Sequence, residues 1–338
     1  MEKDYAYVTS TGVYFEVSKF AGYGKLSGKN ISELKAGARV EIDSTKRTPL
    51  DFAVWKFAED EPNWKSPWGK GRPGWHIECS VMSMKYLGET FEIHGGGHDL
   101  IFPHHENEIA QSEARTGKPF ASKWMHAGLL NISKEKMSKS IGNIIPVHEA
   151  LSQWGPNIIR LYSLSSHYRG PINYSEEAMR NAQENWRLIE NAFAEIQSTV
   201  HEDSSQLEEA RKTVKKEFKA MEKALDEDFN TPASLGALMR LVRFINRAAS
   251  TGKLSKQASE VFEKSLATVT EIYGFKLGEV SLNERQEVEH FVQRRNTLRS
   301  EKKFREADEI RETLKLKGFE LTDHPTRTVW RKAVGKLS

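Results

Sequence analysis

The sequence predicts an α/β segment, then an all-α segment, then a small α+β segment at the C-terminal end. Between residues 91 and 116, an apolar strand-like run leads through three glycines into a helix-like run. From 176 to 274, apolar residues recur three and four positions apart in four successive stretches, as in amphipathic helices. From 283 onward, two charged helix-like stretches end at Gly318 and lead into an alternating run typical of a β-hairpin.

Composition places the chain among ordinary globular proteins. It has 338 residues, of which 38% are hydrophobic and 29% are charged, enough for two or three domains with buried cores. Its single cysteine excludes an internal disulfide and fits a reducing compartment. No apolar run approaches the ~20 residues of a membrane span, and the charged N-terminus does not resemble a signal peptide. We expect a cytoplasmic protein with no membrane partner.

The first 73 residues predict short strands and ordered loops. Residues 1–24 alternate around a Thr-Gly turn at Thr11 and Gly12, which predicts a β-hairpin. Trp64 and Trp68 lie in a loop rich in proline and glycine, where they either cover a site or pin the loop to a core. The remaining predictions are a short helix at 31–35, a strand at 38–42, and an apolar run at 50–58 that packs into a core.

Three residue types that bind transition metals occur within thirty positions. His104 and Glu108 are four apart, so on a helix both side chains point from one face. Cys79, on a helix-like run, would add sulfur to this nitrogen and oxygen, a set that suits zinc. The alternative is a surface histidine and glutamate near a buried structural cysteine. The string HHENE is not HExxH, which argues against a metalloprotease.

Glycines follow the strand that we predict to end at His94. A turn at residues 95–97 would let a nucleotide lie against bare backbone, and Asp99 could hold a ribose hydroxyl. An ordinary tight turn explains the glycines equally well.

A lysine-serine string, KMSKS, occupies residues 136–140. Lys136 and Lys139 flank small polar residues, and Gly142 would let the loop move. Two mobile ammonium groups can follow the charge that shifts between the β- and γ-phosphates of ATP during attack at the α-phosphate. The complete string argues against the alternative of a solvated lysine-rich face.

Taken together, these strings resemble the cysteinyl-tRNA synthetases, which are class I aminoacyl-tRNA synthetases. The strings that carry the resemblance are GWHIEC at 74–79, HGGGHDLIFPHHENEIAQ at 94–111, WMHAG at 124–128 and KMSKSIGN at 136–143. The resemblance implies the second half of a Rossmann-type class I synthetase catalytic domain. A helical bundle and a small α+β C-terminal anticodon-binding module would follow it.

The resemblance also implies roles for individual residues. One Zn²⁺ per chain would bind the thiolate of the substrate cysteine. Mg²⁺ would accompany ATP, the second substrate. The implied zinc ligands are Cys79, His104 and Glu108; Trp75 lines the cysteine pocket; Gly95, Gly96 and Asp99 lie along the adenylate; Lys136 and Lys139 act on the ATP phosphates.

The sequence departs from the family in one respect. Family members carry a HIGH motif, and a further zinc cysteine, in a segment ahead of the region matched here, and this sequence contains neither. HGGGH at 94–98 is no substitute. We therefore expect three of the family's four zinc ligands and one of its two ATP motifs. We also expect an activity that depends on the missing N-terminal part, for which a separate chain carrying HIGH is one source.

The resemblance divides the chain into five segments. They are the end of the connecting insertion at 1–72, the second half of the catalytic domain at 73–145, a stem-contact region at 146–175, a helical bundle at 176–282 and the anticodon-binding module at 283–338.

Basic charge is concentrated in the last segment. Residues 283–338 hold 14 Lys and Arg against 10 Asp and Glu, a net +4, whereas the whole chain has +3. Trp330 offers a stacking face and Arg331 a planar set of donors, which together suit unstacked RNA bases. The alternative is a solvated face with Trp330 in the core of a hairpin. The similarity of this segment, including TVWRK, to the family's anticodon module favours contact with RNA.

We therefore expect a cysteine–tRNA ligase that activates cysteine with ATP and transfers it to tRNA(Cys). The first alternative is a non-catalytic tRNA-binding relative, which the missing HIGH segment favours and the intact KMSKS string disfavours. The second is a ligase that joins cysteine to a small amine, which would leave the basic C-terminal segment without a purpose.

Overall fold

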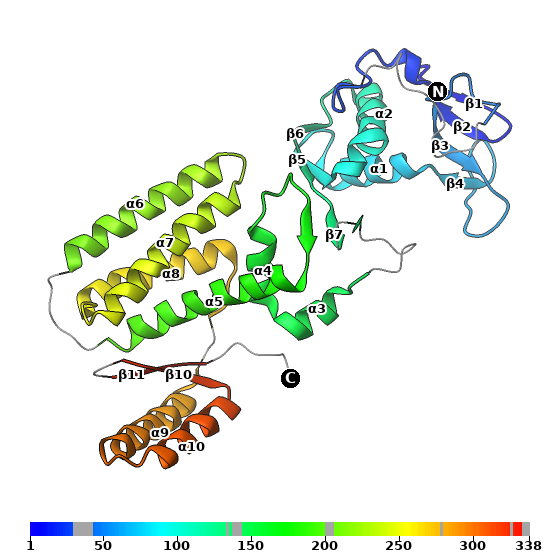
Figure 1. The fold of residues 1–338 in the computed structure, drawn as a ribbon. Helices are drawn as coiled ribbons and strands as arrows, with labels where there is room; N and C mark the ends of the chain where they lie inside the picture. Colours follow the sequence, from blue (N-terminus) through cyan, green and yellow to red (C-terminus); the bar gives the residue numbers. More distant parts are fainter. Residues whose placement is uncertain are drawn as a thin grey trace. The chain divides into compact units, whose positions relative to one another are not determined.

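The computed structural model describes residues 1–29, 43–132, 135–136, 144–199, 206–277, 280–324 and 327–332. The chain forms two compact units, residues 1–129 and residues 130–338. Figure 1 shows their helices and strands. No helix among the described residues is long and apolar enough to cross a membrane.

The first unit begins with an antiparallel sheet in the order β1-β2-β3-β4. Its strands are β1 (Ala6–Val8), β2 (Gly12–Phe15), β3 (Phe52–Phe57) and β4 (Gly71–Pro73), and a helical turn, η1 (Val17–Lys19), follows β2. The predicted hairpin is confirmed, since β1 pairs with β2 on either side of Thr11. The predicted core packing of 50–58 is confirmed for Phe52 in β3. The helix and strand predicted at 31–35 and 38–42 lie outside the described residues.

A parallel strand pair with its crossover completes the first unit. In chain order the elements are α1 (Trp75–Leu87), β5 (Phe91–Gly97), the helical turns η3 (His98–Leu100) and η4 (Ile101–His105), α2 (Glu106–Thr116) and β6 (Ala121–Ala127). β5 pairs in parallel with β6, from Phe91 opposite Ala121 to Gly97 opposite Ala127. The crossover of this βαβ unit carries η4 and α2, and α1 packs against both of them.

One prediction about this region was wrong. The three glycines do not form a turn after His94, because β5 continues through Gly97 and pairs with Met125, His126 and Ala127 of β6. The glycine signal was misread because glycine marks a close backbone approach as well as a turn. The turn that we predicted here begins only at η3.

The start of α2 is fixed by a buried carboxylate. Glu106 is fully buried, and its two oxygens accept hydrogen bonds from the backbone N–H groups of Gly24 at 2.9 Å and Ser27 at 2.8 Å. The apolar core that holds α2 against the antiparallel sheet consists of Phe15, Val17, Tyr23, Phe52, Ala110 and Ala114. The position of α2, and of every side chain on its first turn, is therefore set by the N-terminal sheet and the loop that follows it.

The second unit opens with a three-stranded sheet in the order β8-β7-β9. Its elements are β7 (Leu130–Ile132), β8 (Glu135–Lys136), α3 (Val147–Trp154), α4 (Pro156–Leu164) and β9 (Ile172–Tyr174). The helix that we predicted over 156–169 is α4, which ends five residues earlier. The helix α3 was not predicted from the sequence.

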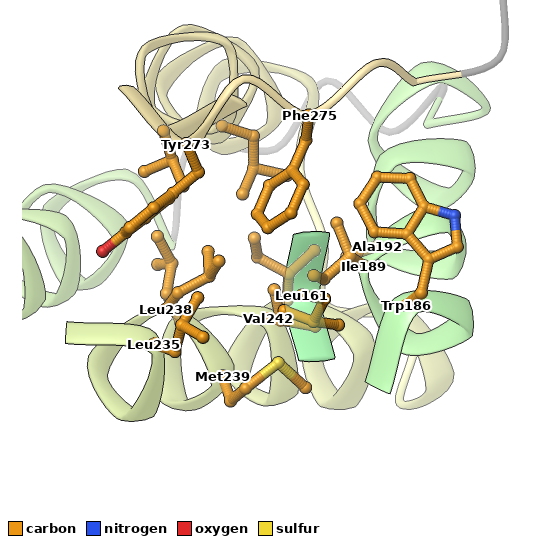
Figure 2. Packing of buried hydrophobic residues seen from close by; sticks show 14 of the residues in the cluster. Leu161, Trp186, Ile189, Ala192, Leu235, Leu238, Met239, Val242, Tyr273 and Phe275 are labelled. Carbon is orange, nitrogen blue, oxygen red and sulfur yellow. The ribbon is translucent and has the colours of Figure 1, made fainter. Parts of the chain in front are cut away.

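Four amphipathic helices follow, as the spacing of apolar residues predicts. They are α5 (Glu176–Gln197), α6 (Leu207–Asp226), α7 (Thr231–Ser250) and α8 (Lys256–Tyr273), and α8 ends at Gly274 with a left-handed φ of 66°. Figure 2 shows part of their shared core, in which Trp186 and Ile189 of α5 face the same apolar interior as Leu238 of α7 and Phe275. The helices pack together around this core because each helix buries one apolar stripe in it.

The start of α7 depends on Asn230. The Asn230 side-chain oxygen accepts a hydrogen bond from the N–H of Ala233 at 3.2 Å, and Pro232 occupies an early position where its missing N–H costs nothing. We expect Asn230→Ala to lower the free energy of unfolding by about 1 kcal/mol, because one backbone donor loses its acceptor. Asn230→Asp, which keeps an acceptor, should retain the wild-type midpoint in thermal unfolding. Equal losses in both variants would contradict this account of the cap.

The last elements are α9 (Leu282–Ser300), α10 (Phe304–Leu316), β10 (Phe319–Asp323) and β11 (Thr328–Lys332). The predicted helix interruption near Ser300 and the hairpin are both present. In the hairpin, Phe319 of β10 pairs with Lys332 of β11 at one end, and Asp323 pairs with Thr328 at the other. Pro325 of the predicted turn lies outside the described residues. A fully buried Arg295 donates two hydrogen bonds to Asp323, at 2.7 and 2.8 Å, and so fastens α9 to β10.

Candidate metal and substrate site

The structure brings the three predicted zinc ligands together in the first unit. Cys79 lies on α1, His104 in η4 and Glu108 on the first turn of α2. One ligand atom from each lies within 4.8 Å of the other two. His104 and Glu108 are buried and Cys79 is half-buried. The grouping depends on the spacing of His104 and Glu108 and on the packing of α1 against α2.

Glu108 is the centre of this arrangement. Its side chain is completely buried, and neither carboxylate oxygen accepts a hydrogen bond from a described residue. His104 Nε2 lies 3.5 Å from Oε1, and His94 Nε2 lies 3.0 Å from Oε2. A buried carboxylate without donors is costly unless a cation compensates it. The surroundings of Glu108 therefore fit a bound metal ion.

His104 is held so that one ring nitrogen faces Glu108. Its Nδ1 lies 2.9 Å from Nδ1 of His76, within hydrogen-bond distance, which leaves Nε2 on the side of the carboxylate. Burial lowers the pKa of both rings, that of His76 to about 3, so both are neutral at physiological pH. A neutral imidazole oriented through its other nitrogen is the usual form of a histidine metal ligand.

Cys79 lies close to the negative charge of the Glu108 carboxylate. Burial raises the pKa of its thiol, and the nearby Glu108 carboxylate raises it further. Without a cation this thiol stays protonated. A divalent ion between the two groups would reverse the effect, because it stabilises thiolate and carboxylate together. The donor set of one sulfur, one nitrogen and one oxygen fits zinc.

Two histidines that the sequence patterns did not indicate also lie at this site. His94 and His105 each place a ring nitrogen within 4.8 Å of a Glu108 oxygen and of each other, so they form a second possible ligand set with the same glutamate. His105 Nδ1 also lies 2.8 Å from His126 Nε2. The only signal available was composition, since six of the eleven histidines of the chain fall between residues 76 and 126.

Trp75 lies directly against the predicted ligands. Its indole ring stacks on His104, with ring centroids 4.5 Å apart, and 58% of its surface is exposed. One ring face is thus fixed near the metal residues while the side chain remains accessible. The role of Trp75 in holding substrate stays a prediction.

The glycines of β5 are close to protein groups. A Cβ on Gly96 would lie 2.8 Å from Cε1 of His105, and a Cβ on Gly95 would lie 3.0 Å from the carbonyl oxygen of Met125. Gly96 therefore makes room for the His105 ring beside the cluster. Asp99 lies in η3, directly after these glycines. Contact of Gly95, Gly96 and Asp99 with an adenylate stays a prediction.

The two lysines of KMSKS lie in the second unit. Lys136 is the last residue of β8, where it pairs with Asn131 of β7. Lys139 lies outside the described residues. The action of both on ATP phosphates stays a prediction.

Arg331 and Trp330 lie on β11. Arg331 has only 10% of its side chain exposed and forms ion pairs with Glu190 of α5 and Glu320 of β10. The Trp330 ring packs edge-on against Phe319 at 5.7 Å, and Arg285 lies 5.5 Å from its centroid. These contacts agree with the alternative of a residue in the hairpin core. Recognition of RNA by either residue stays a prediction, and for Arg331 it would require the guanidinium to leave two carboxylates.

Comparisons with known proteins place the chain in a family. The family described as tRNA synthetases class I (C) catalytic domain matches residues 1–184, and the DALR domain matches residues 220–278. The cysteine–tRNA ligase of Carboxydothermus hydrogenoformans is 44% identical over 98% of this chain and 72% of the relative. That of Thermococcus onnurineus is 45% identical over the same shares.

Among solved structures, a LeuRS from Agrobacterium radiobacter K84, in a ternary complex with tRNA and LeuAMS, aligns with 62% of this chain and 31% of its own. Its identity is 16% and its TM-score 0.47. These matches give no support to a second chain that carries HIGH. The sequence matches, which extend over almost the whole chain, show that it belongs to the cysteine–tRNA ligases, a family of class I aminoacyl-tRNA synthetases.

Proposed function

We propose that this chain performs the zinc-assisted selection and activation of cysteine for transfer to tRNA(Cys). The observation that carries the proposal is the convergence of Cys79 and His104 on the buried carboxylate of Glu108, which accepts no hydrogen bond from the part of the chain that the structure describes. Sulfur, nitrogen and oxygen ligands of this kind suit zinc, which would bind the substrate thiolate and would bind the hydroxyl of serine much more weakly. Membership of the cysteine–tRNA ligases supports the same substrate.

The residues around the cluster have separate tasks in this proposal. His76 orients His104 through the contact between their Nδ1 atoms. Trp75, stacked on His104 with its other face accessible, would pack against the bound cysteine. Gly96 admits the His105 ring, which helps to close the floor of the site. Together these groups would hold the cysteine side chain and leave its carboxylate free to react.

The reaction itself has two steps. An oxygen of the cysteine carboxylate attacks the α-phosphorus of ATP, and the bond to pyrophosphate breaks. A hydroxyl of the terminal ribose of tRNA(Cys) then attacks the carbonyl carbon of the adenylate, and AMP leaves. In the first step Lys136 and Lys139 would stabilise the charge that develops on the departing pyrophosphate, with Mg²⁺ on the same phosphates.

Cysteine-dependent exchange between ATP and pyrophosphate tests this function with the purified full chain and added zinc. We expect exchange with cysteine and none with serine. We expect Lys139→Ala to lower the exchange rate roughly 100-fold, because one oriented donor to the departing phosphate is lost, while zinc content stays the same. The control is Lys118→Ala, which removes an exposed lysine paired with Glu89.

The possible outcomes separate the alternatives. Exchange by the wild-type chain that is unchanged in Lys139→Ala would remove the proposed role of that lysine. Exchange that appears only when a polypeptide carrying HIGH is added would make the activity dependent on that motif. Absence of exchange under both conditions, together with retained tRNA binding, would favour a non-catalytic tRNA-binding relative.

A further inference from the structure

A cavity of about 390 Å³ lies in the second unit, where α4, β9, α5 and the start of α7 meet. This volume is near the lower end of the range for small-molecule sites, roughly 300–1,000 Å³. Buried apolar side chains line it, among them Leu161, Leu235 and Met239, which Figure 2 shows on α4 and α7. Its polar lining consists of Tyr162, Ser165, Ser166, Asn173, Asn181 and Asn185.

The chemistry of the lining limits what can bind. None of the described residues that line this cavity carries a formal charge. By contrast, the cavity between α5, α9 and β11 is lined by Glu190, Arg285 and Arg331. A phosphate, a carboxylate or an ammonium group would lose its hydration in the neutral cavity without gaining an opposite charge. The cavity therefore suits an uncharged ligand with an apolar body.

Three asparagines at the cavity, of which Asn173 and Asn181 are exposed and Asn185 is half-buried, have amides that a ligand could bind in place of water. Among the described residues, the side chains of Asn173, Asn181 and Asn185 form no hydrogen bond with the protein, and neither does the hydroxyl of Ser166. Each amide offers two N–H donors and a carbonyl acceptor side by side. Such a pair matches the adjacent donor and acceptor on the edge of a nucleobase.

The floor of the cavity contains a further unsatisfied group. Tyr162 is buried, and its hydroxyl has no hydrogen-bond partner among the described residues. Burial raises the pKa of this hydroxyl to about 12, so the phenol is uncharged at physiological pH. The lining thus stays neutral even where it is most polar.

Gly236 leaves one wall of the cavity open. It lies inside α7, where glycine costs about 1 kcal/mol of helix stability relative to alanine. A Cβ at this position would meet only the end of the Arg240 side chain, at 3.7 Å. Helix packing therefore does not require glycine here, and the missing side chain leaves room in the cavity.

We propose that this cavity binds a single uncharged nucleobase, with the asparagine amides on its edge and the apolar side chains against its ring. The source of the base is an unstacked nucleotide of the tRNA. This identification of the source rests on the proposed function, while the nucleobase chemistry rests on the lining alone. Free nucleosides have the same chemistry, and the experiment separates the two sources.

Two variants of the full chain test the proposal. Gly236→Leu fills the cavity with a side chain that the backbone accepts and that favours a helix, so the variant should fold. Asn185→Leu keeps the size of the side chain and removes its amide. The matched control is Gln183→Leu, a similar change on the same turns of α5 at a residue that does not line the cavity. Thermal unfolding of all three checks that they are folded.

Binding of a labelled tRNA(Cys) transcript is measured by fluorescence anisotropy. Protection of single bases from chemical modification is measured on the same complex. We expect Gly236→Leu and Asn185→Leu to weaken binding about tenfold and to remove the protection of one base, while Gln183→Leu changes neither. A second arm titrates adenosine, guanosine, cytidine and uridine into the wild-type chain and into Gly236→Leu.

Three outcomes of these binding measurements are possible. A loss of tRNA affinity and of base protection in both cavity variants supports a tRNA base as the ligand. Nucleoside binding that Gly236→Leu abolishes, with unchanged tRNA affinity, supports the nucleobase chemistry and assigns it to free nucleosides. Unchanged tRNA affinity together with no nucleoside binding overturns the proposal. Failure of the pyrophosphate exchange assay would leave this test intact, because it measures binding without catalysis.

Discussion

Glu108→Gln will reduce the zinc content of the purified chain from one ion to nearly none. Glutamine has almost the same shape as glutamate, but it cannot supply the negative charge that a buried divalent cation needs. The two oxygens of Glu108 face His94 and His104 and accept no hydrogen bond from a described residue, so the proposed zinc ion would be the partner of this carboxylate. Loss of residues that merely orient metal ligands costs 10–100-fold in affinity, so we expect roughly 100-fold or more here.

Zinc content measured by plasma mass spectrometry, and zinc affinity measured with a competing chelator, check this expectation. Glu78→Gln is the matched control, because Glu78 precedes Cys79 on α1 and is exposed. The zinc affinity of His76→Ala should lie between those of Glu108→Gln and Glu78→Gln, because His76 contacts only Nδ1 of His104, which does not face Glu108. Full zinc occupancy in Glu108→Gln would refute the ligand set of Cys79, His104 and Glu108. Loss of zinc in His94→Ala with retention in Cys79→Ala would assign the ion to the histidine set instead.

The sequence predicted those parts of the structure that local rules determine. The amphipathic helices were predictable because a 3.6-residue period survives in any tertiary context that buries one face. His104 and Glu108 were predictable as neighbours because four residues make one helical turn. The first hairpin was predictable from the Thr-Gly turn between two alternating runs.

What failed depended on contacts between distant residues. Gly95 and Gly96 indicated a turn by local rules, but the Met125 carbonyl and the His105 ring, across the sheet and on the crossover, make glycine necessary inside a strand. His94 joins the cluster because β5 and η4 meet in space, and no spacing rule connects positions 94 and 105 with Glu108. The ion pairs of Arg331 could not be predicted either, because nothing near Arg331 in the sequence revealed Glu190, 141 residues away.

Arg331→Leu will loosen the C-terminal hairpin from α5. The arginine is paired with Glu190, of which 7% is exposed, so its removal takes a guanidinium away from a buried carboxylate that also accepts a hydrogen bond from the Trp186 indole at 2.7 Å. Breaking one side of a buried ion pair typically costs 3–5 kcal/mol. Hydrogen exchange of backbone amides in β10 and β11 measures the local opening. We expect protection there to fall roughly 100-fold, which corresponds to about 3 kcal/mol.

A second substitution determines whether the buried charge is the cause. Glu190→Gln in the Arg331→Leu background keeps the acceptor for Trp186 and removes the buried negative charge, so it should restore most of the protection. Arg211→Leu, which breaks an exposed pair with Glu208, should change protection by no more than about 1 kcal/mol. If Arg331 instead serves RNA recognition, its replacement will weaken tRNA binding and leave amide protection unchanged. Because Arg331 has two carboxylate partners, we expect instead that its replacement lowers amide protection. Any loss of RNA affinity would then follow from the displaced hairpin.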